Sequence, residues 1–371
     1  MTSVDTQAES SIADLARLAR QSSDLIVSLQ DPSGAYPASP TFSAYRGYCW
    51  FRDGAYIADG VSSMGEVESA SAFFDWCARI LESRAEQIDG IVAAAAAGTP
   101  VADADMLPTR FTFDGRDGDD EWWDYQLDGY GTWLWAVVEH AQRHGLSLDR
   151  WSRAIDLSVA YLRSSWQRPC FDWWEENADQ VHGSTLGCIA GGFIAVDRAG
   201  LASLSDEIAA LRALITEQGL HDGHLAKWLG SSAVDGSLAS VVYPLAVFPP
   251  QSPVGAATIA AIERELTVGN GVHRYLDDTF FGGGQWPLLS CMLGLAFSAA
   301  GERERALEQL RWAASTATPQ GELPEQVDSH LLAPEMRQEW VERWGTVATP
   351  LLWSHGMFLR LASELELGSR A

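Results

Sequence analysis

The sequence contains little positive charge. Fifty acidic residues stand against 25 lysines and arginines, which gives a formal net charge of −25. A field of this sign repels phosphate backbones and anionic lipid, so neither nucleic acid nor a membrane is an expected partner. A neutral small molecule fits this charge better than a polyanion does.

Signals for export and for membrane insertion are also missing. The chain starts MTSVDTQAESS, without the basic start and apolar run of a signal peptide, and no segment approaches the roughly 20 apolar residues of a membrane span. The five cysteines are widely spaced and include no CxxC pair, which favours reduced thiols over a disulfide framework. We therefore expect a cytoplasmic protein.

No stretch of the sequence has the composition of a linker. The 371 residues contain no Ser/Pro-rich run, no long block of charge and no abrupt change in composition. Length alone would suit roughly two or three domains. Without a linker we expect a single domain over residues 1–371, and the sequence does not indicate an oligomeric state.

Helical periodicity dominates the chain, and alternating strand-like runs are rare. Gly or Pro often follows a periodic segment, as helix ends favour. The total is about twelve helices, which predicts an all-α fold. The stronger segments are 12–29, 133–144, 148–166, 184–199, 203–218 and 303–316, and the weaker ones are 54–64, 66–87, 236–246, 254–266, 286–300 and 348–366.

A faint repeat indicates how these helices are arranged. GEVESASAFFDW begins at Gly65 and GERERALEQLRW begins at Gly301, with Gly-Glu, Ala and Trp at matching positions. Each copy follows a helix that begins after a polar or aromatic loop. Such pairs in a ring predict a six-fold α/α barrel, with two concentric rings of helices. Inner helices should be apolar nearly all round, as LLSCMLGLAFSAA (288–300) is. An open α-solenoid is the alternative that the same helices permit.

The segments between helices are rich in Trp, Asp, Glu and Gly. Loops carry function when a rigid scaffold positions them, and alternate loops of a barrel lie at one end. We therefore expect five stretches to converge on one cleft: YRGYCWFRDG (45–54), DGRDGDDEWWDYQLDGYG (114–131), CFDWWEENADQVHG (170–183), GVHRYLDDTFFGGGQW (271–286) and QGELPEQVD (320–328).

The stretch DWWEE (172–176) has the composition of a proton donor's surroundings. Hydrolysis of a glycosidic bond uses one protonated and one ionised carboxyl group. Burial against Trp173 and Trp174, and repulsion between Glu175 and Glu176, would both raise a carboxyl pKa. The alternative is a helix start with solvated glutamates near its positive end.

A second carboxylate follows a proline in GELPEQVD, where Glu325 stands on a stiff loop suited to a base that holds one water. It could equally be a solvated loop residue.

Sixteen tryptophans are many, and several lie in the same loops, where flat rings could stack on sugar faces or simply pack the barrel mouth. Arg52-Asp53, and Arg274 with Asp277-Asp278, could bind hydroxyls or form structural ion pairs.

Other motifs are weaker. His221 and His224 form an HxxH without a third ligand, Gly282-Gly283-Gly284 is not followed by GK[ST], and no GxSxG occurs. DGRDGDDE (114–121) lacks the alternating ligands of a calcium loop. We expect neither a metal nor a cofactor.

Taken in order, the loops resemble glycoside hydrolase family 15, the glucoamylase family, from about Tyr45 to about Phe358. WFRDG resembles the W-x-R-D segment, WWDYQLDGYG the next loop, WWEE the family's WEE, HRYLDDTF the segment R-Y-P-E-D-x-Y, LPEQVD the base segment and LLWSHG the segment L-x-W-S-x-A. The resemblance implies Glu175 as general acid and Glu325 as general base. It implies substrate-binding roles for Trp50, Arg52, Asp53, Trp122, Gln126, Asp128, Trp174, Glu176, Arg274, Asp278, Trp286 and Trp353.

The chain departs from the family pattern near the sugar beyond the cleaved bond. Leu276, Asp277 and Phe280 replace the usual Pro, Glu and Tyr, and GGGQWP replaces the common G-N-P-W. These changes leave linkage open between α-1,4, α-1,6 and α,α-1,1. No β-sandwich or carbohydrate-binding module is expected. In this respect the chain resembles barrel-only members of the family that cleave isomaltose.

The resemblance therefore predicts an inverting, exo-acting α-glucoside hydrolase that releases β-glucose from short malto- or isomalto-oligosaccharides. An inverting disaccharide phosphorylase and a trehalase on the same barrel are alternatives. A third alternative, from another class, is a non-catalytic sugar-binding protein.

Overall fold

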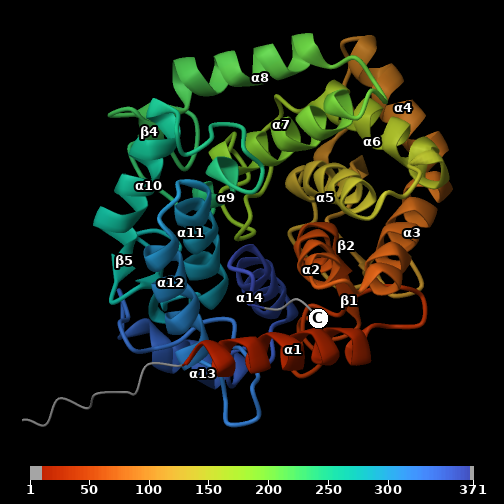
Figure 1. Ribbon diagram of the computed structural model, residues 1–371. Helices are drawn as coiled ribbons and strands as arrows, with labels where there is room; N and C mark the ends of the chain where they lie inside the picture. Colours follow the sequence, from red (N-terminus) through yellow and green to blue (C-terminus); the bar gives the residue numbers. More distant parts are fainter. Residues whose placement is uncertain (1–10, 368–371) are drawn as a thin grey trace, which may run out of the picture.

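The computed structural model describes residues 11–367 and has two concentric rings of helices, which Figure 1 shows from one end. The inner ring is a closed circuit, because each inner helix contacts the next one and the last contacts the first. This closure excludes the open solenoid and confirms the α/α barrel. The inner helices are α2 (Phe51–Ser63), α5 (Asp128–His144), α7 (Gly183–Arg198), α9 (Leu238–Val242), α11 (Pro287–Ala299) and α14 (Leu352–Glu364).

The outer ring alternates with the inner ring along the chain, so that each outer helix packs on inner neighbours. Its members are α1 (Ile12–Leu29), α3 (Val67–Ser83), α6 (Ser152–Ser165), α8 (Ser205–Gln218), α10 (Pro253–Leu266) and α12 (Arg303–Ser315). Two outer helices start with a capping serine: the Ser11 side chain accepts a hydrogen bond from Asp14 N–H at α1, and the Ser252 side chain accepts one from Gly255 N–H at α10, where Pro253 takes the first position.

The sequence repeat corresponds to a structural repeat. Gly65 joins α2 to α3 and Gly301 joins α11 to α12, so both copies connect an inner helix to an outer one. Both glycines adopt positive φ, +91° and +85°, in the region that side chains disfavour. The Gly-Glu signature therefore marks the same tight turn at two places in the barrel.

Two inner helices are covered on every side, as predicted for the inner ring, although α2 also buries charged residues such as Asp59. Residues 51–62 of α2 and 287–297 of α11 are all buried. Gly60 of α2 faces Gly356 of α14, where a Cβ on Gly60 would lie 2.3 Å from the Gly356 carbonyl oxygen. Two inner helices thus approach each other more closely than side chains would allow.

Several predicted boundaries were wrong. The segment 66–87 breaks at Arg84, and a separate, unpredicted helix α4 (Ala85–Ala96) follows. Helix α9 is only five residues long instead of 236–246, and α5 starts at Asp128 rather than residue 133. The last inner helix begins at Leu352, because Pro350 limits helix formation before it. An unpredicted α13 (Met336–Trp344) brings the described residues to fourteen helices.

The strands are short antiparallel pairs that shape loops rather than a sheet. Their bounds are β1 (Tyr48–Trp50) with β2 (Arg110–Thr112), β3 (Leu220–His221) with β4 (His224–Leu225), and β5 (Thr267–Val268) with β6 (Gly271–Val272).

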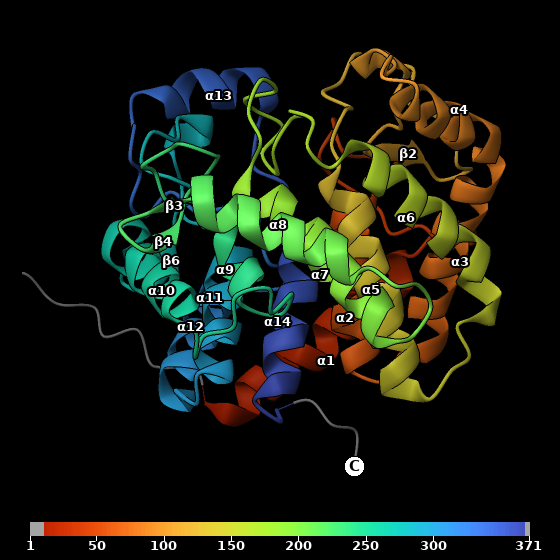
Figure 2. The same cartoon turned by 90° about the horizontal axis from the view of Figure 1, so that it is seen from above.

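The long connections gather at the end of the barrel where the inner helices begin. Figure 2 shows the barrel from the side, with α4 and α13 near this end. Trp50, Trp286 and Leu351 directly precede α2, α11 and α14, and all three line the same cavity. No helix between residues 11 and 367 is long and apolar enough to cross a membrane.

Candidate active site

A cavity of about 240 Å³ opens among these loops, with walls that are largely aromatic. The five stretches expected to converge all contribute to it. Of the predicted site residues, those on its wall are Trp50, Arg52, Asp53, Trp122, Trp174, Glu175, Glu176, Arg274, Trp286, Glu325 and Trp353. The three others, Gln126, Asp128 and Asp278, lie behind this wall and bind residues that form it.

Glu175 lies on a tight turn that its own segment builds. The Asp172 side chain accepts hydrogen bonds from the backbone N–H groups of Trp174 and Glu176, at 2.9 and 3.0 Å, and the Asp172 carbonyl accepts from Glu175 N–H. Glu175 has φ +65°, a conformation that costs a non-glycine residue about 1–3 kcal/mol and that clusters at functional sites. The turn therefore stores strain at a carboxyl group facing the cavity.

One oxygen of the Glu175 carboxyl group receives all its hydrogen bonds. The indole N–H groups of Trp50 and Trp122 donate to Oε1 at 2.8 and 2.9 Å, and Gln126 Nε2 donates to the same atom at 3.4 Å. Burial raises the pKa of Glu175, against the lowering effect of Arg52 and of these three donors. Oε2 is then the oxygen able to carry an acidic proton.

The expected cause of this raised pKa was only partly correct. Burial contributes as predicted, and Trp173 and Trp174 line the same cavity as Glu175, while the hydrogen bonds come from two other tryptophans, Trp50 and Trp122. Glu176 is also directed elsewhere, because its carboxylate accepts a hydrogen bond from the Tyr275 hydroxyl and pairs with Arg274 Nη2 at 3.3 Å. Its charge is therefore compensated by Arg274 instead of being held against Glu175.

Glu325 lies on the same cavity, buried to 2% exposure. The Tyr45 hydroxyl donates to Glu325 Oε1 at 2.8 Å, while Oε2 has no hydrogen-bond partner in the protein. Burial raises the pKa of Glu325 to about 7, opposed by the Tyr45 hydrogen bond and the Arg274 charge. A buried carboxyl oxygen without a protein partner is suited to hold a water molecule.

The loop that carries Glu325 is anchored on both sides. Glu325 N–H donates to the Ala348 carbonyl at 2.9 Å. Ser354 Oγ donates to the Pro324 carbonyl at 2.8 Å, and His355 Nε2 accepts from Leu323 N–H at 2.9 Å. The Ser-His pair of LLWSHG, which lacked a nucleophile motif, thus fixes the backbone on which Glu325 stands.

Arg52 and Asp53 form a buried polar corner of the cavity, with 3% and 8% exposure. Arg52 Nη1 donates to Gln126 Oε1 at 2.7 Å and to Asp128 Oδ2 at 3.0 Å. Arg52 Nε and Asp53 Oδ2 lie 3.3 Å apart without hydrogen-bond alignment, so both lack a hydrogen-bond partner. Burial raises the pKa of Asp53 to about 7, against the attraction of Arg52. Unpartnered polar atoms in a cavity are suited to bind hydroxyl groups.

Arg274 and Asp278 form the second polar cluster. Arg274 bonds Asp278 through Nε at 2.8 Å and Nη2 at 2.5 Å, a paired geometry that fixes the guanidinium plane. Asp278 has no exposed surface and therefore acts through Arg274.

Some cavity residues were not among the predicted ones. Trp123 and Trp173 belong to the loop tryptophans that were expected to face sugars, and both line the cavity. Tyr45 lies within a loop already singled out but had no predicted role. Trp344 comes from the unpredicted α13 and had no signal. The wall residues without a predicted role are Ala38, Phe42, Ala44, Tyr45, Phe280, Trp344 and Leu351.

His221 and His224 pair across the hairpin of β3 and β4. Within residues 11–367, no three His, Cys, Asp or Glu side chains gather in a way that could hold a metal ion. The five cysteines are free and buried.

Comparison with known proteins places this site in a family. The model of "Glycosyl hydrolases family 15" matches residues 14–277. An isomaltose glucohydrolase of Kribbella flavida is 54% identical over 363 residues, covering 96% of this chain and 94% of the relative. An uncharacterised glycosyl hydrolase of Methanocaldococcus jannaschii is 24% identical over 90% of this chain, which spans only 53% of that relative's length.

Solved structures agree. A glycosidase variant in which a glutamate is replaced by alanine, in complex with glucose, is 53% identical and superposes with a TM-score of 0.94 over 99% of this chain and 100% of its own. A glucoamylase from Saccharomycopsis fibuligera is only 14% identical but matches 99% of this chain and 98% of its own with a TM-score of 0.72, which shows the shared fold. This chain belongs to family 15 of the glycosyl hydrolases.

Proposed function

We propose that this glycosidase is an inverting, exo-acting α-glucosidase that hydrolyses isomaltose and short isomalto-oligosaccharides from the non-reducing end. The observation that carries the proposal is the pair of buried carboxyl groups on one cavity, Glu175 with its donors on a single oxygen and Glu325 with one free oxygen. The α-1,6 preference is supported by the identity to a named isomaltose glucohydrolase.

In the proposed reaction, the terminal glucose occupies the corner formed by Arg52 and Asp53, whose free polar atoms bind its hydroxyl groups. Glu175 gives its proton to the glycosidic oxygen as the bond to the anomeric carbon breaks. Glu325 removes a proton from a water molecule that attacks this carbon from the opposite face. The products are β-glucose and the shortened alcohol. Glu175 has lost one proton to the leaving oxygen and Glu325 has gained one from water, and exchange with solvent restores both carboxyl groups.

The pKa shifts bear on these two roles. Burial raises the pKa of Glu175, which is the direction that a proton donor needs. Tyr45 and Arg274 favour the ionised form of Glu325, whose pKa of about 7 leaves a working fraction of base near neutrality. A phosphorylase is less well supported, because the two arginines on the cavity are already paired with Asp128 and Asp278.

The test is to incubate the protein with maltose, isomaltose, panose and trehalose and to follow the released anomer by proton NMR. We expect β-glucose first, and most rapidly from isomaltose. Release of α-glucose would refute inversion, and a requirement for phosphate would favour the phosphorylase. We also propose a cytoplasmic location, for which five free thiols are supporting evidence.

A further inference from the structure

A single buried lysine joins three loops of the active site from behind. Lys227 follows β4, is 4% exposed and does not line the cavity. Its Nζ lies 2.6 Å from Asp235 Oδ2, 3.1 Å from Asp172 Oδ2 and 3.8 Å from the centre of the Tyr275 ring. Asp172, Asp235 and Tyr275 come from three different interhelical loops. One ammonium group therefore contacts three segments that are distant in the sequence.

Each of these contacts leads to a residue of the proposed chemistry. Asp172 accepts the two N–H groups that form the turn of Glu175. Asp235 accepts the indole N–H of Trp174 at 3.0 Å. Tyr275 donates its hydroxyl proton to Glu176. Displacement of the ammonium would thus reach the proton donor and its neighbour together.

The charges explain why a cation is needed at this point. Burial raises the pKa of Asp172, but Lys227, together with His182 and the Glu176 backbone N–H, outweighs it and the net shift is downward. Burial lowers the pKa of Lys227, but Asp235 and Asp172 more than reverse this. Both groups are therefore charged. Without Lys227, two buried carboxylates would lack their common counter-ion, and an uncompensated buried charge is strongly unfavourable.

We propose that Lys227 is a positioning residue: it keeps the Glu175 turn in its left-handed conformation and keeps Tyr275 and Glu176 in place on the leaving-group side. The inference rests on the proposed role of Glu175 as proton donor. Lys227 acts only through Asp172, Asp235 and Tyr275. Its loss should impair protonation of the leaving group more than binding of the terminal glucose, because Arg52 and Asp53 lie outside its contacts.

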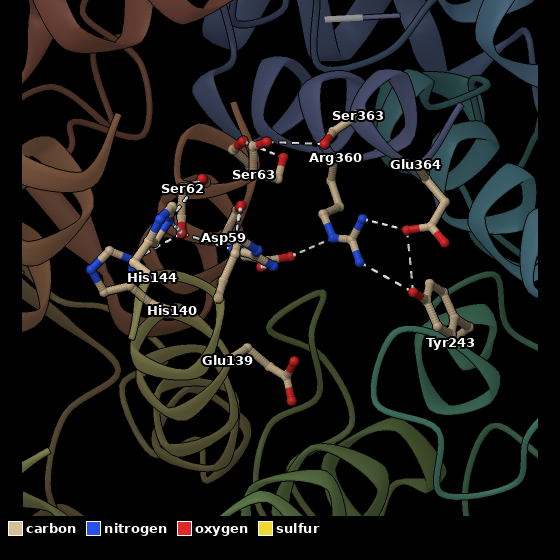
Figure 3. A network of polar contacts seen from close by, with 12 residues as sticks. Asp59, Ser62, Ser63, Glu139, His140, His144, Tyr243, Arg360, Ser363 and Glu364 are labelled. Atoms are coloured by element: carbon tan, nitrogen blue, oxygen red, sulfur yellow. Dashed lines mark hydrogen bonds and ion pairs between the residues drawn. The ribbon is translucent and has the colours of Figure 1, made fainter. Parts of the chain in front are cut away.

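A matched buried cation exists away from the cavity. Arg360 on α14 bonds Asp59 at 3.0 Å and Glu364 at 2.6 Å, within a polar network that includes Ser62, His140 and Tyr243 (Figure 3). This network joins the last turns of inner helices, and none of its members lines the cavity. Arg360→Met therefore removes a comparable ion pair without touching the active-site loops.

The experiment compares Lys227→Met, Arg360→Met and wild type on isomaltose and on p-nitrophenyl α-glucoside, whose leaving group requires little protonation. We expect Lys227→Met to reduce kcat on isomaltose about tenfold more than on the aryl glucoside. Inhibition by glucose should change by less than about twofold, since Arg52 and Asp53, which bind the terminal sugar, keep their contacts. Arg360→Met should lower Tm and leave the ratio of the two kcat values unchanged.

Equal losses on both substrates in Lys227→Met would overturn the proposal, because that is the result of a merely structural lysine. If this variant does not fold, Asp235→Asn decides the question. It removes the closer of the two carboxylates that hold the ammonium, at 2.6 Å, and should displace it, so an unchanged ratio in this variant would also overturn the proposal. A wild-type protein that does not cleave isomaltose would refute the proposed function instead. The role of Lys227 would then be tested by comparing kcat on the glucose disaccharide that the protein does cleave with kcat on the aryl glucoside.

Discussion

The two indole hydrogen bonds to Glu175 allow a quantitative prediction. Trp50 precedes α2, is 3% exposed and donates its Nε1–H to Glu175 Oε1 at 2.8 Å. Trp50→Phe removes this donor and keeps an aromatic ring, while Trp122 continues to donate to the same oxygen at 2.9 Å. The substitution therefore isolates one bond to the ionised form of the acid.

The magnitude follows from the strength of such a bond. A hydrogen bond to a charged group contributes about 1.5–3 kcal/mol, and one pKa unit corresponds to about 1.4 kcal/mol. Loss of the donor disfavours the carboxylate, so the pKa of Glu175 should rise by about one to two units. An acid with a higher pKa keeps its proton to higher pH. The basic limb of the activity profile should move upward by the same amount.

The assay is kcat/KM for isomaltose as a function of pH, which reports the free enzyme's acid and base. Trp286→Phe is the matched control, because Trp286 also lines the cavity but its indole nitrogen has no hydrogen-bond partner in the protein. We expect the basic limb of this control to stay in place. A basic limb that is unmoved, or moved to lower pH, in Trp50→Phe would show that Glu175 is not the group titrating there.

Three further outcomes are expected. Glu175→Gln and Glu325→Gln should each lower kcat by about 10²–10⁴-fold with unchanged circular dichroism, and wild-type-like turnover would refute the assignment. Because Tyr45 donates to the Glu325 carboxylate, Tyr45→Phe should raise the pKa of Glu325, which is about 7, and move the acidic limb of kcat/KM to higher pH; an acidic limb at lower pH contradicts this. Trp123 is 46% exposed at the cavity. Trp123→Ala should raise KM for isomaltotriose more than for isomaltose, and an equal effect on both would exclude a contact beyond the second sugar.

Periodicity and composition were sufficient for most of the fold. The inner and outer helices follow apolar spacing, and the Gly-Glu repeat at Gly65 and Gly301 correctly indicated paired helices. Helices were missed where the residues favour helix formation but the apolar residues do not recur at helical spacing. The alanine-rich α4 has helix-forming residues but buries only Ile88 and Ile91, so no apolar stripe marked it. Helix α13 buries only Trp340.

The sequence could predict only those site residues that lie in recognisable loop motifs. Arg52, Glu175 and Glu325 each lie in a motif of the family, and the structure brings all three to one cavity. Tyr45 and Lys227 have no such motif. A lone tyrosine or lysine has many possible partners, and the contacts that matter join residues far apart in the chain. Only tertiary structure could identify them.

The direction of the inner helices explains how the barrel holds so many buried carboxyl groups at one end. A helix N-terminus carries partial positive charge and a C-terminus partial negative charge. Asp53 lies in the first turn of α2 and Asp128 begins α5, whereas Arg143 lies in the last turn of α5. The acids therefore lie where helix dipoles favour carboxylates, and Arg143 lies where they favour cations.

Asp59 tests this rule, because it is an acid near the C-terminus of α2. Burial there raises its pKa, yet Arg143 at 2.6 Å and Arg360 at 3.0 Å outweigh burial and the pKa is lowered. Glu175 has only Arg52 and neutral indole and amide donors to oppose burial, and its pKa stays raised. The same scaffold thus lowers the pKa of one buried carboxyl group and raises that of another, according to how many cations lie beside it.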